Sequence, residues 1–204
     1  MARYTKLIIA AMLCAASQSA AAQKAQPALE IRVAKGAAGE EQGREQLQRI
    51  VTTWDLSRWV FTRTVQIQSG VIPHSHPVLT LNTLYLANDT AQLATLVHEQ
   101  LHWFLTQKQE ATDSAIEALR KLYPNAPAGP PEGARDLYST YLHLIVCMLE
   151  FDAVREVFDE GVARRTLAAW RHYPWVYRQV LDRPEPIRRI LRQFGLDAPD
   201  ARTA

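Results

Sequence analysis

His98, Glu99 and His102 lie within an apolar stretch, LATLVHEQLHWFL, at positions 93–105. Histidines four positions apart share one face of a helix, so both imidazoles can reach the same metal ion. A glutamate beside the first histidine can hold and deprotonate a water molecule at that metal. Because three ionisable groups are costly to bury without partners, the pattern predicts a metal site. The alternative is a pair of structural histidines at a helix surface.

The metal expected at these residues is zinc, which lowers the pKa of a bound water to near 7. Residues 95–104 resemble the motif helix of the zincin superfamily of metallopeptidases, in which His-Glu-x-x-His has an uncharged, apolar frame. The resemblance implies that His98 and His102 bind zinc and that Glu99 is the general base. It also implies that the edge strand before the helix, here 78–83, binds extended substrate by strand addition.

The subtype of zincin depends on the third ligand. The metzincin pattern needs glycine at 105 and histidine at 108, whereas this chain has Leu105 and Lys108, so that class is excluded. The chain is more similar to gluzincins, in which the third zinc ligand is a glutamate from a second helix further along the sequence. The resemblance therefore directs attention to the helix expected at 134–159.

That helix contains the apolar stretch LHLIVCMLEF at 142–151, whose strongly polar side chains are His143 and Glu150. A buried glutamate is rare unless it is paired or bound to metal, so Glu150 is the preferred third zinc ligand. The alternative is an ion pair between Glu150 and an arginine. Seven residues span about 10 Å along a helix, so one zinc ion cannot readily bind both side chains. His143 is then either the ligand in place of Glu150 or a catalytic donor to the substrate oxyanion.

Weaker candidates surround these residues. Cys147 suits a soft metal, but a lone buried cysteine is more often inert packing. His74 and His76, in the loop IPHSHP, are candidates for contacts with substrate or a second metal, against the alternative of exposed loop residues. Tyr138 and Tyr141 are candidates to polarise a substrate carbonyl, although their helical spacing is also typical of packing.

Hydrophobic periodicity predicts the elements that position these residues. Alternation and β-branched content predict strands at 29–34, 59–68 and 78–86. Helical spacing predicts helices at 45–54, from about 90 to 106, at 113–123 and at 134–159, followed by mainly helical sequence. Asn88, Asp89 and Thr90 are candidate N-caps for the motif helix, and Gly195 is a candidate C-cap for the last helix. The expected fold is α+β, with a small N-terminal β-sheet, the motif helix and a mainly helical C-terminal half.

The first 22 residues are typical of a secretory signal peptide. Arg3 and Lys6 precede an apolar run at 7–16, and Ala20 and Ala22 fit an A-x-A cleavage site. The run is short for a bilayer span, so a membrane anchor is the lesser alternative. We expect cleavage after Ala22, export to the periplasm or the cell exterior, and one zincin-like domain at 23–204.

The mature chain is expected to be electrically neutral. Removing Arg3 and Lys6 reduces the 23 Lys and Arg residues to the same number as the 21 Asp and Glu residues. This balance gives no reason to expect a nucleic-acid partner. No segment after the signal is expected to span a membrane, and Cys147, as the one remaining cysteine, excludes an internal disulfide.

The leading functional hypothesis is an exported zinc metallopeptidase that acts on peptide or protein substrates, with Glu99 as general base. The runner-up is a zincin-like metal-binding or assembly protein without turnover. Glu99 favours the enzyme, because a metal store does not need that base. A metal-free apolar helical core is the third hypothesis. Cleavage specificity and oligomeric state remain open at this stage.

Overall fold

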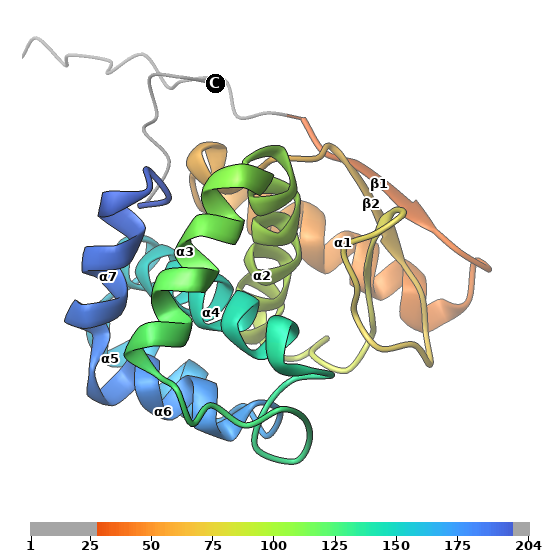
Figure 1. Ribbon diagram of the computed structural model, residues 1–204. Helices are drawn as coiled ribbons and strands as arrows, with labels where there is room; N and C mark the ends of the chain where they lie inside the picture. Colours follow the sequence, from red (N-terminus) through yellow and green to blue (C-terminus); the bar gives the residue numbers. More distant parts are fainter. Residues whose placement is uncertain (1–27, 198–204) are drawn as a thin grey trace, which may run out of the picture.

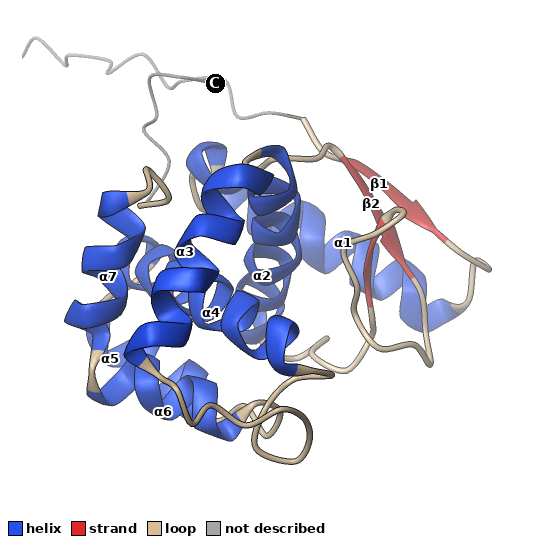
Figure 2. Ribbon diagram, viewed as in Figure 1, coloured by secondary structure: helices blue, strands red, loops and turns tan. Residues whose placement is uncertain are grey.

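A computed structural model describes residues 28–197 of the chain (Figure 1). The predicted signal peptide at 1–22 lies outside the described residues. Within them the fold is α+β and mainly helical, with a small sheet near the N-terminal end (Figure 2). The strands gather on one side of the molecule and most of the helices on the other, so the broad expectation from periodicity is confirmed.

The sheet is parallel, with strand order β1 (Glu30–Val33), β2 (Thr64–Ile67) and β3 (Leu79–Leu81). Ile31 lies opposite Val65, and Val65 lies opposite Leu79. Helix α1 (Ala38–Thr53) connects β1 to β2, and α1 and α2 both contact the sheet. The buried faces of the strands therefore pack against the first two helices.

All three predicted strands are shorter in the structure, the first by one residue at each end and the other two by more. The prediction at 59–68 includes the end of a 3-10 turn, η1 (Ser57–Trp59), and only its second half is strand. The prediction at 78–86 ends at Leu81, because the side chain of Asn82 accepts a hydrogen bond from the Leu84 backbone and turns the chain. These turns are local side-chain effects that alternation of apolar residues does not reveal.

The motif helix is α2 (Asp89–Gln107), which begins where the predicted cap lies. The Asn88 side chain accepts a hydrogen bond from the backbone N–H of Ala91, as an N-cap does. The remaining helices are α3 (Gln109–Leu122), α4 (Leu137–Val157), α5 (Glu160–Ala168), α6 (Pro174–Asp182) and α7 (Pro184–Gln193). Gly195 adopts a left-handed backbone (φ 63°) just after α7, so its predicted capping role is confirmed.

Helix α4 is the centre of the helical half, because it contacts α2, α3, α5, α6 and α7. By length and composition alone it is apolar enough to cross a membrane, so the sequence expectation that no such segment follows the signal was wrong in that respect. However, 78% of its most apolar window is buried inside the protein, as expected for a core helix. This burial places the few polar side chains of α4 against its neighbours.

Candidate metal centre

Three histidine rings converge where α2 packs against α4. His98 and His102 come from one face of α2, and His143 comes from the facing side of α4. Their ring centroids are 5.3, 5.5 and 5.2 Å apart, which is a nearly equilateral triangle. One ligand nitrogen from each ring lies within 4.8 Å of the other two. The arrangement can hold one metal ion with three imidazoles, as catalytic zinc sites do.

Hydrogen bonds fix the orientation of two of these rings. Nδ1 of His143 lies 2.6 Å from the backbone carbonyl of Ser139, an acceptor, so Nδ1 carries the proton. Nδ1 of His98 lies 2.9 Å from Oε2 of Glu150 and donates to that carboxylate. In each ring Nε2 is therefore left as the nitrogen available to a metal. A histidine that donates its other N–H to a carboxylate or carbonyl is the usual support of a metal ligand.

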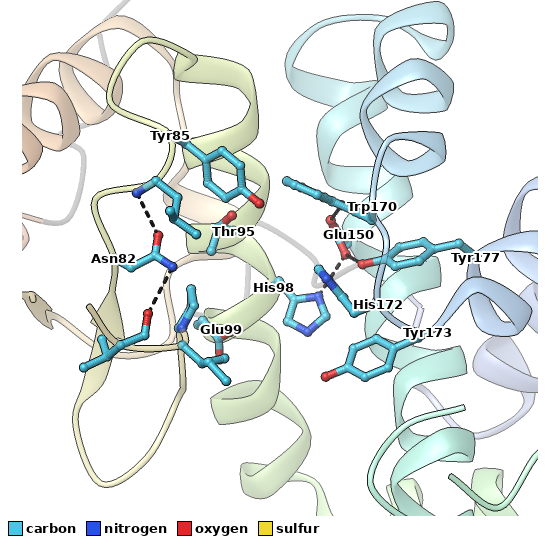
Figure 3. Close-up of a pocket in the computed structure, with 14 residues that line it drawn as sticks. Asn82, Tyr85, Thr95, His98, Glu99, Glu150, Trp170, His172, Tyr173 and Tyr177 are labelled. Atoms are coloured by element: carbon cyan, nitrogen blue, oxygen red, sulfur yellow. Dashed lines mark hydrogen bonds and ion pairs between the residues drawn. The ribbon is translucent and has the colours of Figure 1, made fainter. Parts of the chain in front are cut away.

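Glu150 is fully engaged by hydrogen-bond donors. Besides His98, its carboxylate accepts a bond of 3.0 Å from Nε1 of Trp170 and one of 3.2 Å from the hydroxyl of Tyr177 (Figure 3). Only 1% of the residue is exposed, so these donors replace the water that burial removes. The partners of Glu150 are thus a histidine, an indole and a phenol, and not the arginine considered as the alternative to a metal.

The geometry therefore favours His143 over Glu150 as the third ligand, which reverses the preference drawn from the sequence. His98, Cys147 and Glu150 form a second group of converging donor atoms. This group suits zinc less well, because Nδ1 of His98 already donates to Glu150 and burial raises the pKa of the Cys147 thiol.

Electrostatics keep two of the three histidines neutral and favour a positive charge on the third. Burial lowers the pKa of His143 to about 3 and, together with the charge of His98, holds the pKa of His102 well below its ordinary value. Both rings are therefore neutral, the state that binds a metal. Burial also opposes charge on His98, but hydrogen bonding to Cys147 and Glu150 holds its pKa well above the ordinary value. Glu150 thus stabilises a positive charge at the centre.

Glu99 and His98 line a cavity of about 420 Å³, whereas His102 and His143 do not line it. The residue is 7% exposed, and burial raises the pKa of its carboxyl group, with the charge of His98 acting in the opposite direction. A carboxylate of raised pKa accepts and returns a proton more readily near neutral pH. Glu99 therefore has the position and the environment of a general base.

Tyr173 is a cavity residue that the sequence analysis did not single out. Its ring lies against His143, with centroids 4.3 Å apart, and its hydroxyl points into the cavity below His98 (Figure 3). Within residues 28–197 it is the one residue other than glycine with a left-handed backbone (φ 52°). Such strain persists where the surrounding structure holds it, and it is concentrated at functional sites.

The signal for Tyr173 was present in the sequence WRHYPW, at 170–175. This run places four aromatic or imidazole side chains around a proline turn between two amphipathic helices. Trp170, His172 and Tyr173 from this turn, and Tyr177 from α6, all line the cavity (Figure 3). Helical periodicity accounts for none of the turn residues, so their concentration was the observable cue.

The loop that contains His74 and His76 packs against the motif helix α2 through Trp103. Nε1 of Trp103, the residue after His102, donates a 2.8 Å bond to the carbonyl of Ser75. The His76 ring stacks on Trp103 with centroids 4.2 Å apart. Both loop histidines are exposed, and neither is part of a converging group of metal-binding atoms within the described residues. Their role in covering α2 is thus better supported than a second metal.

The outer edge of β3 is not free at its centre. The N–H and the carbonyl of Thr80 both bond to the backbone of His74, at 2.8 and 3.0 Å. The peptide groups of Thr80 are those that point away from β2, because Leu79 and Leu81 alternate with it. The expectation that 78–83 receives substrate by strand addition is therefore not met at Thr80.

Tyr138 and Tyr141 do not line the cavity. The Tyr138 hydroxyl donates to Asp113 at the surface, and the buried Tyr141 hydroxyl donates to the carbonyl of Tyr123. Their packing interpretation is therefore the better one.

Gln100, inside the motif, is fully buried and holds Phe61 and Thr62 through three hydrogen bonds. This role explains why a polar residue is tolerated there.

Comparison with protein-family models, with curated proteins and with solved structures found no match to this chain.

Proposed function

We propose that the protein is a zinc-dependent peptidase in which His98, His102 and His143 bind the metal and Glu99 is the general base. The observation that carries the proposal is that Glu99 lines a cavity together with His98, one of the three converging histidines. A simple metal store has no need of a buried carboxylate of raised pKa beside the metal. With a histidine as third ligand, the site departs from the gluzincin pattern.

The donor set fits zinc. Three imidazoles with one open position are the ligands of many catalytic zinc ions, and both His98 and His143 have their second nitrogen occupied. His98, whose protonated form is favoured by Glu150, would release a proton when the metal binds. When bound there, zinc would supply Lewis acidity and lower the pKa of a water molecule toward neutrality. Glu150 would support the centre through His98, as a carboxylate that orients the ring and balances its charge.

The residues of this chain then divide the proton chemistry among them. Glu99 takes a proton from the attacking water and delivers it to the amine that leaves when the C–N bond breaks. The Tyr173 hydroxyl donates a hydrogen bond to the carbonyl oxygen as negative charge develops on it. Tyr173 takes the role of oxyanion donor that the sequence analysis had considered for His143.

Glu99→Gln tests this proposal. The purified chain, never exposed to chelator, is analysed for metal and incubated with a mixed peptide library whose products are identified by mass spectrometry. We expect one zinc per chain in the wild type and in the variant, and at least about a 10²-fold loss of hydrolysis in the variant. Glu117→Gln is the matched control, because Glu117 is an exposed glutamate of α3 paired with Arg120.

Two results would contradict the proposal. A stoichiometric zinc signal without hydrolysis in the wild type would favour the alternative, a zincin-like metal-binding or assembly protein. Unchanged hydrolysis in Glu99→Gln would exclude Glu99 as the base.

Export remains part of the proposal. The signal peptide expected at 1–22 predicts that the mature chain starts at Gln23, which the intact mass of exported protein tests. A mass that includes Met1 would indicate a retained anchor.

A further inference from the structure

The cavity at Glu99 offers a ligand mainly apolar surface, because several of its polar side chains are already hydrogen-bonded within the protein. Asn82 donates to the carbonyl of Val71 and accepts from Leu84, and Thr95 donates to the carbonyl of Ala91. The polar atoms of Trp170 and Tyr177 are both used by Glu150. Aromatic rings form the wall opposite α2 (Figure 3). Such a cavity suits a bulky apolar, especially aromatic, side chain.

The rim of this cavity continues the apolar surface outward. Ile72 is 85% exposed and Leu84 is 76% exposed, which makes them the most exposed large apolar side chains among residues 28–197. Both line the cavity. Their exposure beside a candidate catalytic residue indicates a surface that substrate covers.

A second groove, of about 610 Å³, follows the cavity and has the opposite character. It shares Tyr85, Trp170 and His172 with the cavity, so the two spaces are adjacent. Arg165 and Arg171 line it, and no aspartate or glutamate does. Within the described residues, neither arginine forms an ion pair with a carboxylate of the chain. The groove therefore presents two free guanidinium groups to a ligand, and carboxylates are their preferred partners.

The distance between the cavity and the groove determines which residues of a bound peptide reach each of them. Ala91, at the groove, lies seven residues before His98 on the same helix, or about 10 Å along its axis. An extended peptide covers that distance in about three residues. A peptide that begins at the metal therefore places its first residue in the cavity and its third in the groove.

We infer that the substrate is a peptide with a bulky apolar residue immediately after the scissile bond and a carboxylate on about the third residue after it. This inference rests on the proposed function and deepens it. If this carboxylate is the C-terminus of the substrate, the enzyme releases short C-terminal fragments. If it is an acidic side chain, the enzyme can cleave within a longer peptide.

The test uses N-terminally blocked alanine hexapeptides with phenylalanine third from the end. They are made as the free acid, as the C-terminal amide, and as the amide with glutamate as the last residue. We expect the zinc-loaded full chain to cleave before phenylalanine and to show a kcat/KM about 10-fold higher for the free acid than for the alanine amide. If the glutamate amide is cleaved with the high kcat/KM of the free acid, a side-chain carboxylate is sufficient for recognition. If only the free acid has the high kcat/KM, the enzyme recognises the C-terminal carboxylate of the peptide.

Arginine variants connect the preference to the groove. In the double variant Arg165→Gln/Arg171→Gln, we expect the ratio of kcat/KM for the free acid to kcat/KM for the alanine amide to fall toward one. The value for the amide itself should stay unchanged. Arg189→Gln is the matched control, because Arg189 is an exposed arginine of α7 that lines neither space. Preservation of the preference in the double variant would overturn the assignment of the groove.

Failure of this inference is distinguishable from failure of the proposed function. Equal kcat/KM for the acid and both amides would overturn the inference and leave a working peptidase. If the zinc-loaded chain cleaves nothing, the proposed function fails. Calorimetry with the same three peptides then decides the inference, since tighter binding of the carboxylate forms supports it and equal binding refutes it.

Discussion

The assignment of the third ligand yields the sharpest prediction, because His143 and Glu150 come from the same helix and have different positions in the site. His143→Ala removes one ring of the triangle. Glu150→Gln keeps the shape of its side chain but removes the charge that His98 faces. If His143 binds zinc and Glu150 supports His98, the first change must weaken zinc binding more than the second.

The magnitudes follow from the kind of contact that is lost. Structural zinc sites with four ligands bind with about 10–16 kcal/mol, so one ligand accounts for roughly 3–4 kcal/mol, or about 10²–10³-fold in affinity. Loss of a carboxylate that supports a ligating histidine typically costs about 10–100-fold. Glu156→Gln is the control on the same helix, because Glu156 pairs with Arg58 at the surface, and it should leave zinc affinity unchanged.

Zinc affinity of the three variants is measured by competition with a chelator of known affinity, and Co²⁺ spectra report the number of ligands. We expect the Co²⁺ spectrum of Glu150→Gln to keep the wild-type coordination number, whereas that of His143→Ala changes. A larger loss of zinc in Glu150→Gln than in His143→Ala would refute the three-histidine centre and return Glu150 to the metal.

Three further changes test other parts of the site. Tyr173→Phe should keep zinc and KM and lower kcat by roughly 10²–10³-fold, as expected for one oxyanion donor, and an unchanged kcat would contradict that role. Gln100→Leu should lower the free energy of unfolding by about 3 kcal/mol in urea titrations, because three backbone groups at Phe61 and Thr62 lose their partner. Glu40→Gln should destabilise the protein at pH 7, since backbone N–H bonds, that of Ser69 foremost, lower the pKa of this carboxyl group below 4.5. That stabilisation is present above pH 4.5 and disappears as the pH falls through the lowered pKa, so the two urea midpoints should converge in acid; a constant difference would exclude charge as the cause.

The sequence was most informative where periodicity and capping act locally. The motif helix was predicted from about 90 to 106 and is found at Asp89–Gln107, with the expected Asn88 cap. The buried character of α4 also followed from its uninterrupted apolar circumference. Strand ends were less predictable, because the Asn82 side chain, rather than a change in apolar pattern, ends β3.

Long-range contacts limited what could be predicted of the site. The closed edge of β3 depends on a pairing between Thr80 and His74 across a turn, and strand propensity alone suggests an open edge there. The aromatic wall of the cavity comes from the α5–α6 connection, which has no metal-binding motif to draw attention to it. Helical spacing placed residues on faces of their own helices, but it did not show which faces meet.

Glu150 shows how the same physical premise supports one preference from the sequence and another from the geometry. A buried carboxylate needs compensation, and in a sequence with a nearby zinc motif the metal is the obvious source. The structure supplies compensation from neutral donors instead, since Trp170 and Tyr177 lie 20 and 27 residues away in the chain and reach the same carboxylate from another direction. With these bonds made, Glu150 acts on the centre through His98, where it orients the ring and favours a positive charge. The same distribution explains why α4 carries both polar residues at a spacing of seven. His143 faces the two histidines of α2 directly, whereas Glu150, two turns further on, orients His98 of that helix through a hydrogen bond.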